Sequence, residues 1–218
     1  MEINLLKGLP KNKKPIKKRL KASQLDKILS WKIDKEYFDG SREQGYGGYK
    51  YDGRWSVVAD DFIKYYNLNN KSRILEIGCA KGFLLKEFKN KIRNCELLGM
   101  DISSYAVSKS HKDIKNKIII GNAIELPFED KSFDLIICIN TLHNILNNKN
   151  VGLAIKEMNR VSAKNIFISV GAFRNQKEQD NLDKWAVLST TYMHTSEWLK
   201  LFRAVKYKGD YQWFIPKV

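Results

Sequence analysis

The sequence predicts an α/β fold in which a mostly parallel sheet carries helices on both faces. Short runs of branched apolar residues, typical of buried parallel strands, recur along the chain, and segments with helical spacing of apolar residues lie between them. One such run, residues 74–77, ends in a turn of small residues that opens directly into a helix through residues 83–88. This strand–turn–helix unit is the most informative stretch of the chain.

The length of 218 residues suits one domain with a sizeable core and some additions. No window approaches the roughly 18 apolar residues of a membrane span, and the N-terminus lacks the apolar core of a signal peptide. Cys79, Cys95 and Cys138 form neither an even disulfide framework nor a CxxC metal pattern. We therefore expect reduced cysteines, a cytoplasmic protein and no metal site.

The chain is strongly basic, with 39 basic and 24 acidic residues and a net charge of +15. Residues 1–21 carry seven lysines and Arg19 against Glu2, a net charge of +7. Residues 1–22 show no clear apolar period, so they are expected to form a flexible basic arm. Such an arm is either a tail that contacts phosphate groups or a solvated extension, and we favour the extension.

Residues 23–54 are expected to form a cap made of one helix and a long loop. Ser23 is typical of a helix N-cap, with Asp26 in the first turn. The loop, residues 37–55, holds five glycines and six aromatic residues. That composition fits a lid or binding loop, or a surface loop packed on the sheet edge. The helix should pack onto the core or cover the site. Its apolar residues are Leu25, Ile28, Leu29 and Ile33.

The turn after residues 74–77 predicts a ligand site. A strand that breaks at glycines into a helix N-terminus brings unpaired backbone N–H groups beside a ligand. Gly78 permits the tight turn, and Gly82 lets the new helix pack close to the strand. Glu76, just before the turn, disfavours an anionic pyrophosphate and favours a ligand with a cationic amino group or sulfonium.

Two further strands bring polar groups to the same sheet edge. Residues 96–101 end in Asp101, 19 residues beyond Gly82. In dinucleotide and similar folds, a carboxylate at the tip of this strand accepts hydrogen bonds from both ribose hydroxyls. Residues 118–120 end in a small-residue turn that contains Asn122 and Ala123.

A fourth strand, residues 133–139, brings Asn140 and His143 to that edge, where open α/β sheets bind their ligands. His143 is either a general base near neutral pH or a hydrogen-bonding group of the pocket wall.

The remaining pattern predicts a helix over 151–161, a fifth strand over 165–170 and a helix over 195–202. Two antiparallel strands, near 204–207 and 210–215, are expected to close the sheet, because Lys208-Gly209 between them suits a hairpin turn.

The unit Glu76-x-Gly78-x-x-x-Gly82 after an apolar strand resembles motif I of the class I S-adenosylmethionine (SAM) methyltransferases. Ala80 replaces the middle glycine that this family usually has. The turn at residues 121–123, followed by Leu-Pro-Phe, resembles the family's Gly-Asp-Ala segment, whose aspartate contacts the adenine amino group. Asn122 stands at that position, and its amide oxygen can accept the same hydrogen bond.

The resemblance covers about residues 53–215 and implies a Rossmann-like, seven-stranded sheet with a reversed last strand, in a methyltransferase domain over residues 55–218. It implies SAM as cofactor and S-adenosylhomocysteine (SAH) as product. The residues it assigns to the cofactor are Arg54, Glu76, Gly78, Cys79, Ala80, Gly82, Asp101, Ile102, Asn122, Ala123 and Asn140. Those expected to bind substrate are Tyr46, Tyr49, Tyr51, Trp55, His143 and His194. For Arg54, contact with the SAM carboxylate competes with a plain role at a helix start.

The expected reaction is methyl transfer from SAM to an O or N atom of a small or medium-sized acceptor, anionic examples being a sugar nucleotide or a polysaccharide precursor. His143 is the candidate catalytic base, needed only if the acceptor is protonated. An RNA methyltransferase that uses the basic arm is the first alternative, and it is not favoured because no appended RNA-binding domain is visible. A non-catalytic SAM-binding partner subunit is the second alternative.

Overall fold

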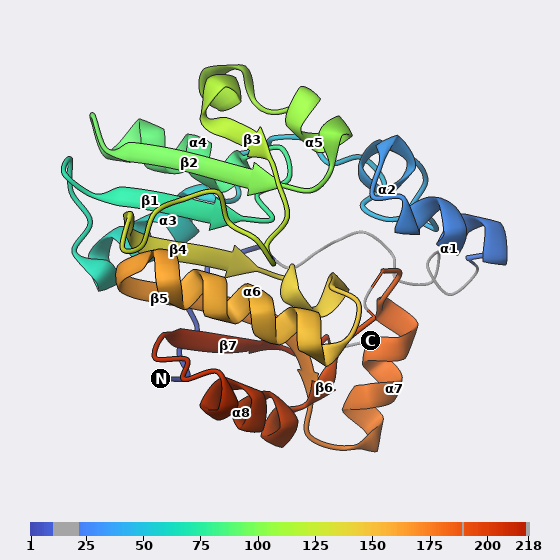
Figure 1. Ribbon diagram of the computed structural model, residues 1–218. Coiled ribbons are helices and arrows are strands. Elements are labelled where there is room, and N and C mark those ends of the chain that lie inside the picture. The colour runs from blue at the N-terminus through green and yellow to red at the C-terminus, as the bar shows by residue number, and fades with distance from the viewer. Residues whose placement is uncertain (11–21, 189, 217–218) are drawn as a thin grey trace.

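The computed structural model describes residues 1–10, 22–188 and 190–216, which fold around a seven-stranded sheet. The strand order is β3-β2-β1-β4-β5-β6, and β7 also pairs with β5. All of the paired strands run parallel, so their carboxyl ends share one edge of the sheet (Figure 1). The strands are β1 (Arg73–Ile77), β2 (Glu96–Asp101), β3 (Ile118–Ile120), β4 (Phe133–Ile139), β5 (Ser162–Phe173), β6 (Met193–His194) and β7 (Asp210–Phe214).

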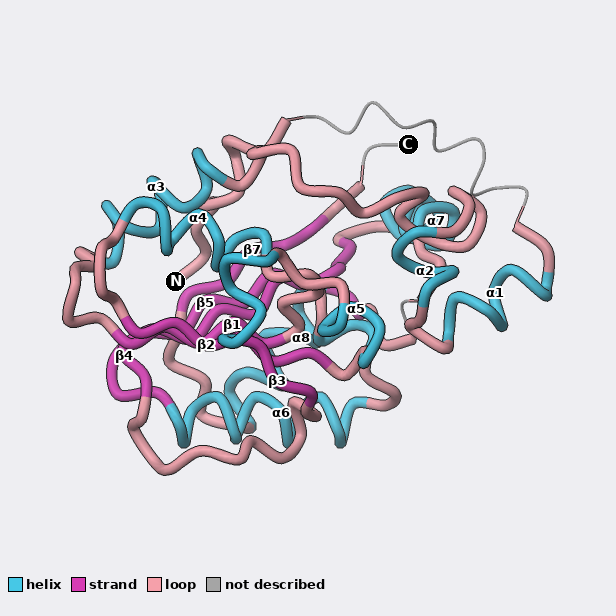
Figure 2. The backbone as a smooth tube through the Cα atoms, turned by 90° about the horizontal axis from the view of Figure 1, so that it is seen from above, coloured by secondary structure: helices cyan, strands magenta, loops and turns pink. Residues whose placement is uncertain are grey.

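Helices cover both faces of the sheet. Figure 2 shows α3 and α4 on one face and α6 on the other, while α1, α2 and α7 lie beyond the carboxyl ends of the strands. The α-helices are α1 (Gln24–Trp31), α2 (Lys35–Asp39), α3 (Ser56–Tyr66), α4 (Phe83–Lys91), α5 (Ser104–Ser108), α6 (Asn148–Val161), α7 (Gln176–Trp185) and α8 (Thr195–Ala204). Two 3₁₀ helices are η2 (Lys112–Lys117) and η3 (Leu142–Asn144).

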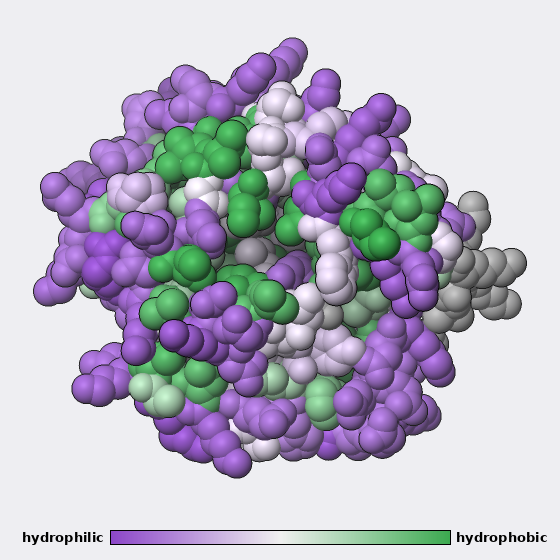
Figure 3. All heavy atoms as spheres, turned by 45° about the vertical axis from the view of Figure 1, so that its right-hand side comes forward, coloured by the Kyte–Doolittle hydropathy of each residue, from purple (hydrophilic) through white to green (hydrophobic). Residues whose placement is uncertain are grey.

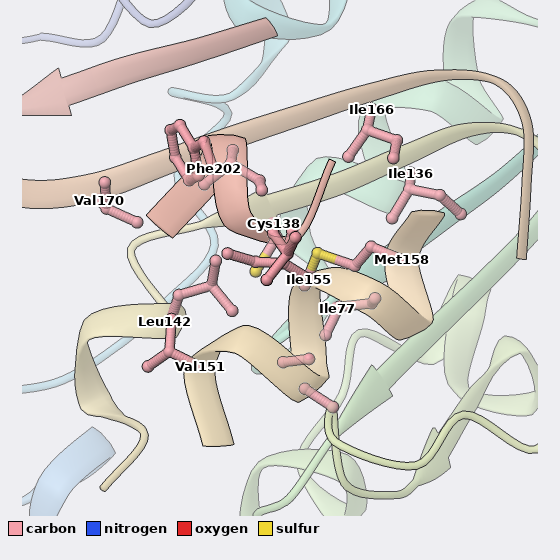
Figure 4. Close-up of a cluster of buried hydrophobic side chains, with 14 of the residues drawn as sticks. Ile77, Ile136, Cys138, Leu142, Val151, Ile155, Met158, Ile166, Val170 and Phe202 are labelled. Carbon is pink, nitrogen blue, oxygen red and sulfur yellow. The ribbon is translucent and has the colours of Figure 1, made fainter. Parts of the chain in front are cut away.

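The core on the α6 face follows from helical spacing. Val151, Ile155 and Met158 recur at intervals of three or four residues, so they form one stripe of α6. All three are fully buried against the sheet, where they meet Ile136 and Cys138 of β4 (Figure 4). This packing fixes β4, and with it the loop that follows its carboxyl end.

The core on the opposite face is aromatic. Phe62 of α3 packs edge-on against Phe167 of β5, with ring centroids 4.9 Å apart, and against Phe88 of α4 at 6.3 Å. Because both faces are covered, β1 is buried from Ile74 to Ile77, as its continuous apolar pattern predicts. The predicted α/β fold with a seven-stranded, mostly parallel sheet is therefore confirmed.

The last strand is not reversed, which corrects the expected hairpin. β7 runs parallel to β5, with Phe167 opposite Asp210 and Gly171 opposite Phe214. Of the residues expected as its antiparallel partner, Ala204 ends α8 and the next three lie in the loop after it, where buried Val205 packs into the core beside α6. Because a helix lies between β6 and β7, the connection is a crossover, and a crossover returns the chain in the same direction.

The first ten residues are packed, unlike the flexible arm expected over residues 1–22. Leu5 and Leu6 are buried in the core on the α3 face. The Ile3 N–H donates to Tyr211 O at 2.9 Å, so this segment runs along the outer edge of β7. Residues 11–21, which hold most of the lysines of the expected arm, lie outside the described residues.

The cap helix α1 forms where predicted but does not pack onto the core. Ser23 caps it in a full capping box with Asp26. Leu25 and Ile28 are 63% and 59% exposed, so packing onto the core, the first of the two expectations, is wrong, and covering the site remains. The helix is held instead through buried Ser30, whose hydroxyl donates to Gln44 O in the cap loop.

Candidate active site

Three residues of the turn after β1 have left-handed backbone conformations, namely Gly78, Ala80 and Gly82. Gly78 has φ of +73°, and its N–H donates to Met100 O of β2 at 2.7 Å. A Cβ at Gly78 would overlap the side chain of Thr141, so only glycine lets the turn approach the loop after β4. Ala80 has φ of +50°, a conformation that is strained for alanine. Its N–H donates to Asp101 Oδ2 at 2.7 Å, which holds the strained turn in place.

The glycine that ends the turn acts structurally. Gly82 has φ of +72°, and a Cβ there would collide with Ile114 and Ile118. It therefore lets the start of α4 approach η2 and β3 closely, whereas the expected close approach was to β1. Gly82 is not among the residues that line the cavities described below.

A cavity of about 280 Å³ opens at the carboxyl ends of β1, β2 and β3. Figure 3 looks toward this side of the molecule, whose surface is hollowed near its centre and bordered there by apolar and polar groups. The walls of this cavity combine apolar residues with a few polar ones, as in typical small-molecule sites. Predicted site residues that line it are Tyr46, Gly78, Ala80, Asp101, Ile102, Asn122, Ala123 and Asn140.

Asp101 is the acidic group of this cavity. It is 7% exposed, and its Oδ1 accepts from the Ser103 N–H at 2.9 Å while its Oδ2 accepts from Ala80. Burial raises the pKa of Asp101, and these backbone N–H donors act in the opposite direction. A carboxylate oriented by two N–H groups retains acceptor capacity toward the cavity.

A second cavity of about 440 Å³ adjoins the first on the α3 side. Several residues line both, among them Tyr37, Tyr46, Gly78, Ala80 and Asn140, so the two cavities share a wall at the β1 turn. Other predicted site residues that line the second cavity are Tyr49, Arg54, Trp55, Glu76, Cys79 and His143.

Glu76 is the buried acid of the second cavity. It is 6% exposed, and its Oε2 is buried with no hydrogen-bond partner among the described residues. Burial and, secondarily, the charge of Asp101 raise the pKa of Glu76 to about 8. A buried acceptor without a donor is costly, so this position suits a ligand that brings a cation or an N–H group.

His143 lies on η3, fixed by the strand next to it. It is 3% exposed, and its Nδ1 accepts from the Gly171 N–H of β5 at 2.8 Å. Burial lowers the pKa of His143 to about 4, so the ring is neutral at pH 7. Because Nδ1 is an acceptor, the neutral ring carries its proton on Nε2 and is a hydrogen-bond donor there. This arrangement favours the pocket-wall role over the general base.

The cap is tied to the β1 turn by an ion pair between buried Lys81 and half-buried Asp39. The Lys81 Nζ lies 2.7 and 2.6 Å from the two oxygens of Asp39, the last residue of α2, and also donates to Tyr49 O at 2.9 Å. Tyr105 OH donates to the same carboxylate at 2.8 Å. Tyr49 then stacks on Phe83 at the start of α4, with centroids 4.7 Å apart. The aromatic loop is therefore a wall of the site, as expected from its composition.

Three predicted residues have other partners. Tyr51 donates to Glu87 at 2.6 Å and is not among the residues that line either cavity. His194 caps α8, with Nδ1 on the Ser196 hydroxyl and Nε2 on Arg174 O, and likewise lies outside both linings. Arg54 lines the second cavity but pairs with Asp52, its guanidinium Nε lying 2.8 Å from the carboxylate.

Two polar residues of the second cavity were missed by the sequence analysis. Arg42 in the cap loop is buried, and its Nε has no partner in the described chain. Gln212 of β7 has a buried Oε1 that also lacks one. The sequence offered one feature that could have identified Arg42, namely a cation within a glycine-rich aromatic loop. It offered none for Gln212, because the place of this residue in the cavity wall depends on the position of β7 in the sheet.

Neither a metal-binding cluster nor a membrane-spanning helix is present among the described residues. No group of three histidine, cysteine or acidic side chains is placed to hold a metal ion there. No helix in that part of the chain is long and apolar enough to cross a membrane.

A known protein family matches the part of the chain that carries the β1 turn and the strand ends around it. A family described as "Methyltransferase domain" matches residues 75–168, from β1 into β5. The tRNA (carboxymethyluridine(34)-5-O)-methyltransferase of Arabidopsis thaliana is 28% identical over 147 residues, which are 67% of this chain and 34% of that protein. The chain spans about a third to a half of the length of such curated relatives.

Solved structures share the fold. The YcgJ protein of Bacillus subtilis superposes with a TM-score of 0.55 at 22% identity, covering 67% of this chain and 66% of its own. Phosphoethanolamine N-methyltransferase 2 of Haemonchus contortus, solved with SAH, superposes with a TM-score of 0.58 at 12% identity. That match covers 81% of this chain and 44% of the other.

Proposed function

We propose that this chain is a class I SAM-dependent methyltransferase that transfers the methyl group of SAM to an oxygen or nitrogen atom of a small or medium-sized, anionic acceptor. The observation that carries the proposal is the pair of buried acids on either side of the β1 turn. Asp101 lies in one cavity, and Glu76 lies in the other with an unpartnered oxygen. One elongated ligand with a ribose and an ammonium group fits both.

The residues present fit SAM. Asp101 is oriented to accept from the ribose hydroxyls, and Asn122 lines the same cavity as a partner for the adenine edge. Glu76 is placed to accept from the ammonium group, whose charge would stabilise the ionised carboxylate. When bound, SAM supplies a methyl group already activated by the sulfonium, so the protein contributes alignment and exclusion of water.

The second cavity supplies the acceptor site in this proposal. Tyr46 and Trp55 offer aromatic faces, and His143 offers a neutral Nε2–H that can hold an acceptor oxygen without taking its proton. The relative named for O-methylation of a carboxymethyluridine supports an acceptor that carries an acidic group.

The test is calorimetry with SAM and SAH, followed by methyl transfer to a panel of small acidic acceptors. We expect SAH to bind the wild type and to bind Asp101→Ala at least tenfold more weakly, because the ribose loses its carboxylate acceptor. Absence of SAH binding, or equal binding by the variant, would refute the cofactor assignment. SAH binding without transfer to any acceptor would favour the non-catalytic partner subunit.

A second candidate acceptor is RNA, favoured by the tRNA methyltransferase relative. Residues 11–21 would then contact the phosphate backbone, and their deletion should weaken RNA binding and reduce its dependence on salt. Unchanged RNA affinity after the deletion would count against that role.

A further inference from the structure

A buried arginine in the cap lines the second cavity without an acidic partner. Arg42 is 7% exposed and lies in the cavity wall beside Tyr37 and Tyr46. Its Nη1 donates to Gly45 O at 2.7 Å, while its Nε is buried and has no partner in the described chain. The guanidinium is therefore only partly satisfied by the protein.

The contrast with other arginines of the described chain is informative. Arg54, Arg73, Arg160 and Arg174 each pair with a carboxylate, and their side chains are at least 32% exposed. Arg42 is the buried one, and no ion pair joins it to an acid within residues 1–10, 22–188 and 190–216. An unpaired charge in such a position costs stability, which is typical of a group kept for binding.

The edge of the guanidinium that carries the unpartnered Nε–H matches a carboxylate in its arrangement of donors. One Nη1–H donates to Gly45, while Nε–H, which has no partner among the described residues, and one Nη2–H lie on the opposite edge and form a planar fork. A carboxylate accepts two parallel hydrogen bonds from such a fork. Burial lowers the pKa of Arg42, yet a guanidinium stays protonated in proteins, so the charge persists.

We propose that Arg42 binds a carboxylate group of the methyl acceptor and thereby determines its specificity. The inference rests on the proposed function, since it names the acceptor class of the same site. Tyr37 and Tyr46 beside Arg42 line both cavities, so the bound anion lies near the boundary where cofactor and acceptor would meet. The carboxylate of SAM itself is a second source of the same chemistry, and the experiment separates the two.

The experiment uses the full chain saturated with SAH and three probes: 3-phenylpropionate, its neutral amide and phenyl phosphate. Calorimetry is performed on the wild type, Arg42→Met, Arg42→Lys and the control Arg203→Met, which removes an exposed charge of α8. The wild type and the control should bind the acid at least about tenfold more tightly than the amide. Arg42→Met should abolish that preference, and Arg42→Lys should lose most of it because lysine lacks the fork.

Two readouts separate binding from a structural role. SAH affinity should stay within about twofold of wild type in both variants, and the melting temperature of Arg42→Met should not fall, since an unpaired buried charge is removed. Should Arg42→Met fail to fold, Arg42→Lys carries the test because it keeps the charge.

Three results would overturn the inference. The first is an unchanged preference for the acid in the Arg42 variants, or no preference in the wild type. The second is a tenfold loss of SAH affinity in these variants, which would assign Arg42 to the cofactor's carboxylate. The third is tighter binding of phenyl phosphate than of the acid. A wild type that does not bind SAH would instead refute the proposed function.

Discussion

Replacing Glu76 with glutamine should stabilise the ligand-free protein and weaken its binding of SAH. Burial, and then the charge of Asp101, raise the pKa of Glu76 from 4.5 to about 8. At pH 7 the carboxyl is therefore protonated in the folded protein and ionised in the unfolded chain. Because the folded state binds the extra proton, wild-type stability falls as the pH rises from 4.5 to 8.

The magnitude follows from that difference in pKa. Between pH 4.5 and pH 7, at about 1.36 kcal/mol for each of 2.5 pH units, keeping Glu76 protonated costs about 3 kcal/mol. Glutamine has nearly the same shape and does not ionise. Glu76→Gln should therefore gain about 3 kcal/mol at pH 7, or roughly 6–12 °C in melting temperature for a chain of this size.

Binding should change in the opposite direction. A hydrogen bond between a carboxylate and an ammonium group contributes about 1.5–3 kcal/mol, so SAH should bind Glu76→Gln roughly 10- to 100-fold more weakly. SAH binding to the wild type should release a proton from Glu76. Its affinity should therefore rise with pH up to about 8, while that of the variant should not.

Two assays check the prediction. Thermal unfolding followed by circular dichroism between pH 4.5 and 8.5 measures stability, and titration calorimetry in buffers of different ionisation heat measures proton release. Glu96→Gln, at an exposed position on β2, controls for the loss of one negative charge. A variant less stable than wild type at pH 7, or one that binds SAH equally well, would refute the reasoning.

Three further substitutions test the turn and the cap. Gly78→Ala should abolish SAH binding, because an alanine at φ of +73° is strained and its Cβ would overlap Thr141, so the turn must move. Unchanged SAH affinity by calorimetry would contradict this. Ala80→Gly should add up to about 1 kcal/mol of stability in denaturant unfolding, since glycine relieves the left-handed strain; a destabilised variant would show that no strain is stored. Lys81→Met should cost about 2 kcal/mol by leaving Asp39 unpaired, and should speed proteolysis within residues 40–53. Lys91→Met, which breaks a more exposed pair between α4 and Asp60 of α3, is its control, and equal effects of the two would argue against a cap tie.

The pattern of apolar residues along the sequence was sufficient to predict those parts of the site that lie at the ends of strands. Glu76, Asp101 and Asn140 each follow an apolar run, and parallel strands bring their carboxyl ends to one edge. Their location at one edge of the sheet could therefore be predicted without knowing any long-range contact.

The rest depended on tertiary packing. The direction of β7 is set by the crossover through α8, and the buried Leu5 and Leu6 are held by an edge pairing with Tyr211, more than 200 residues away. The two roles considered for His143 could not be separated from the sequence, because its tautomer depends on a contact with Gly171 of β5 that spacing does not reveal. Such pairings connect distant segments, so a pattern within one segment cannot specify them.

The wall shared by the two cavities has a kinetic consequence. Tyr37 and Tyr46 of the cap close over both, and the cap is fastened to the β1 turn through Lys81 and Asp39. An acceptor seated on the α3 side would obstruct the route along which the tail of the cofactor enters. Turnover should therefore be ordered, with SAM entering first and SAH leaving last, and SAH should inhibit competitively with respect to SAM at every acceptor concentration.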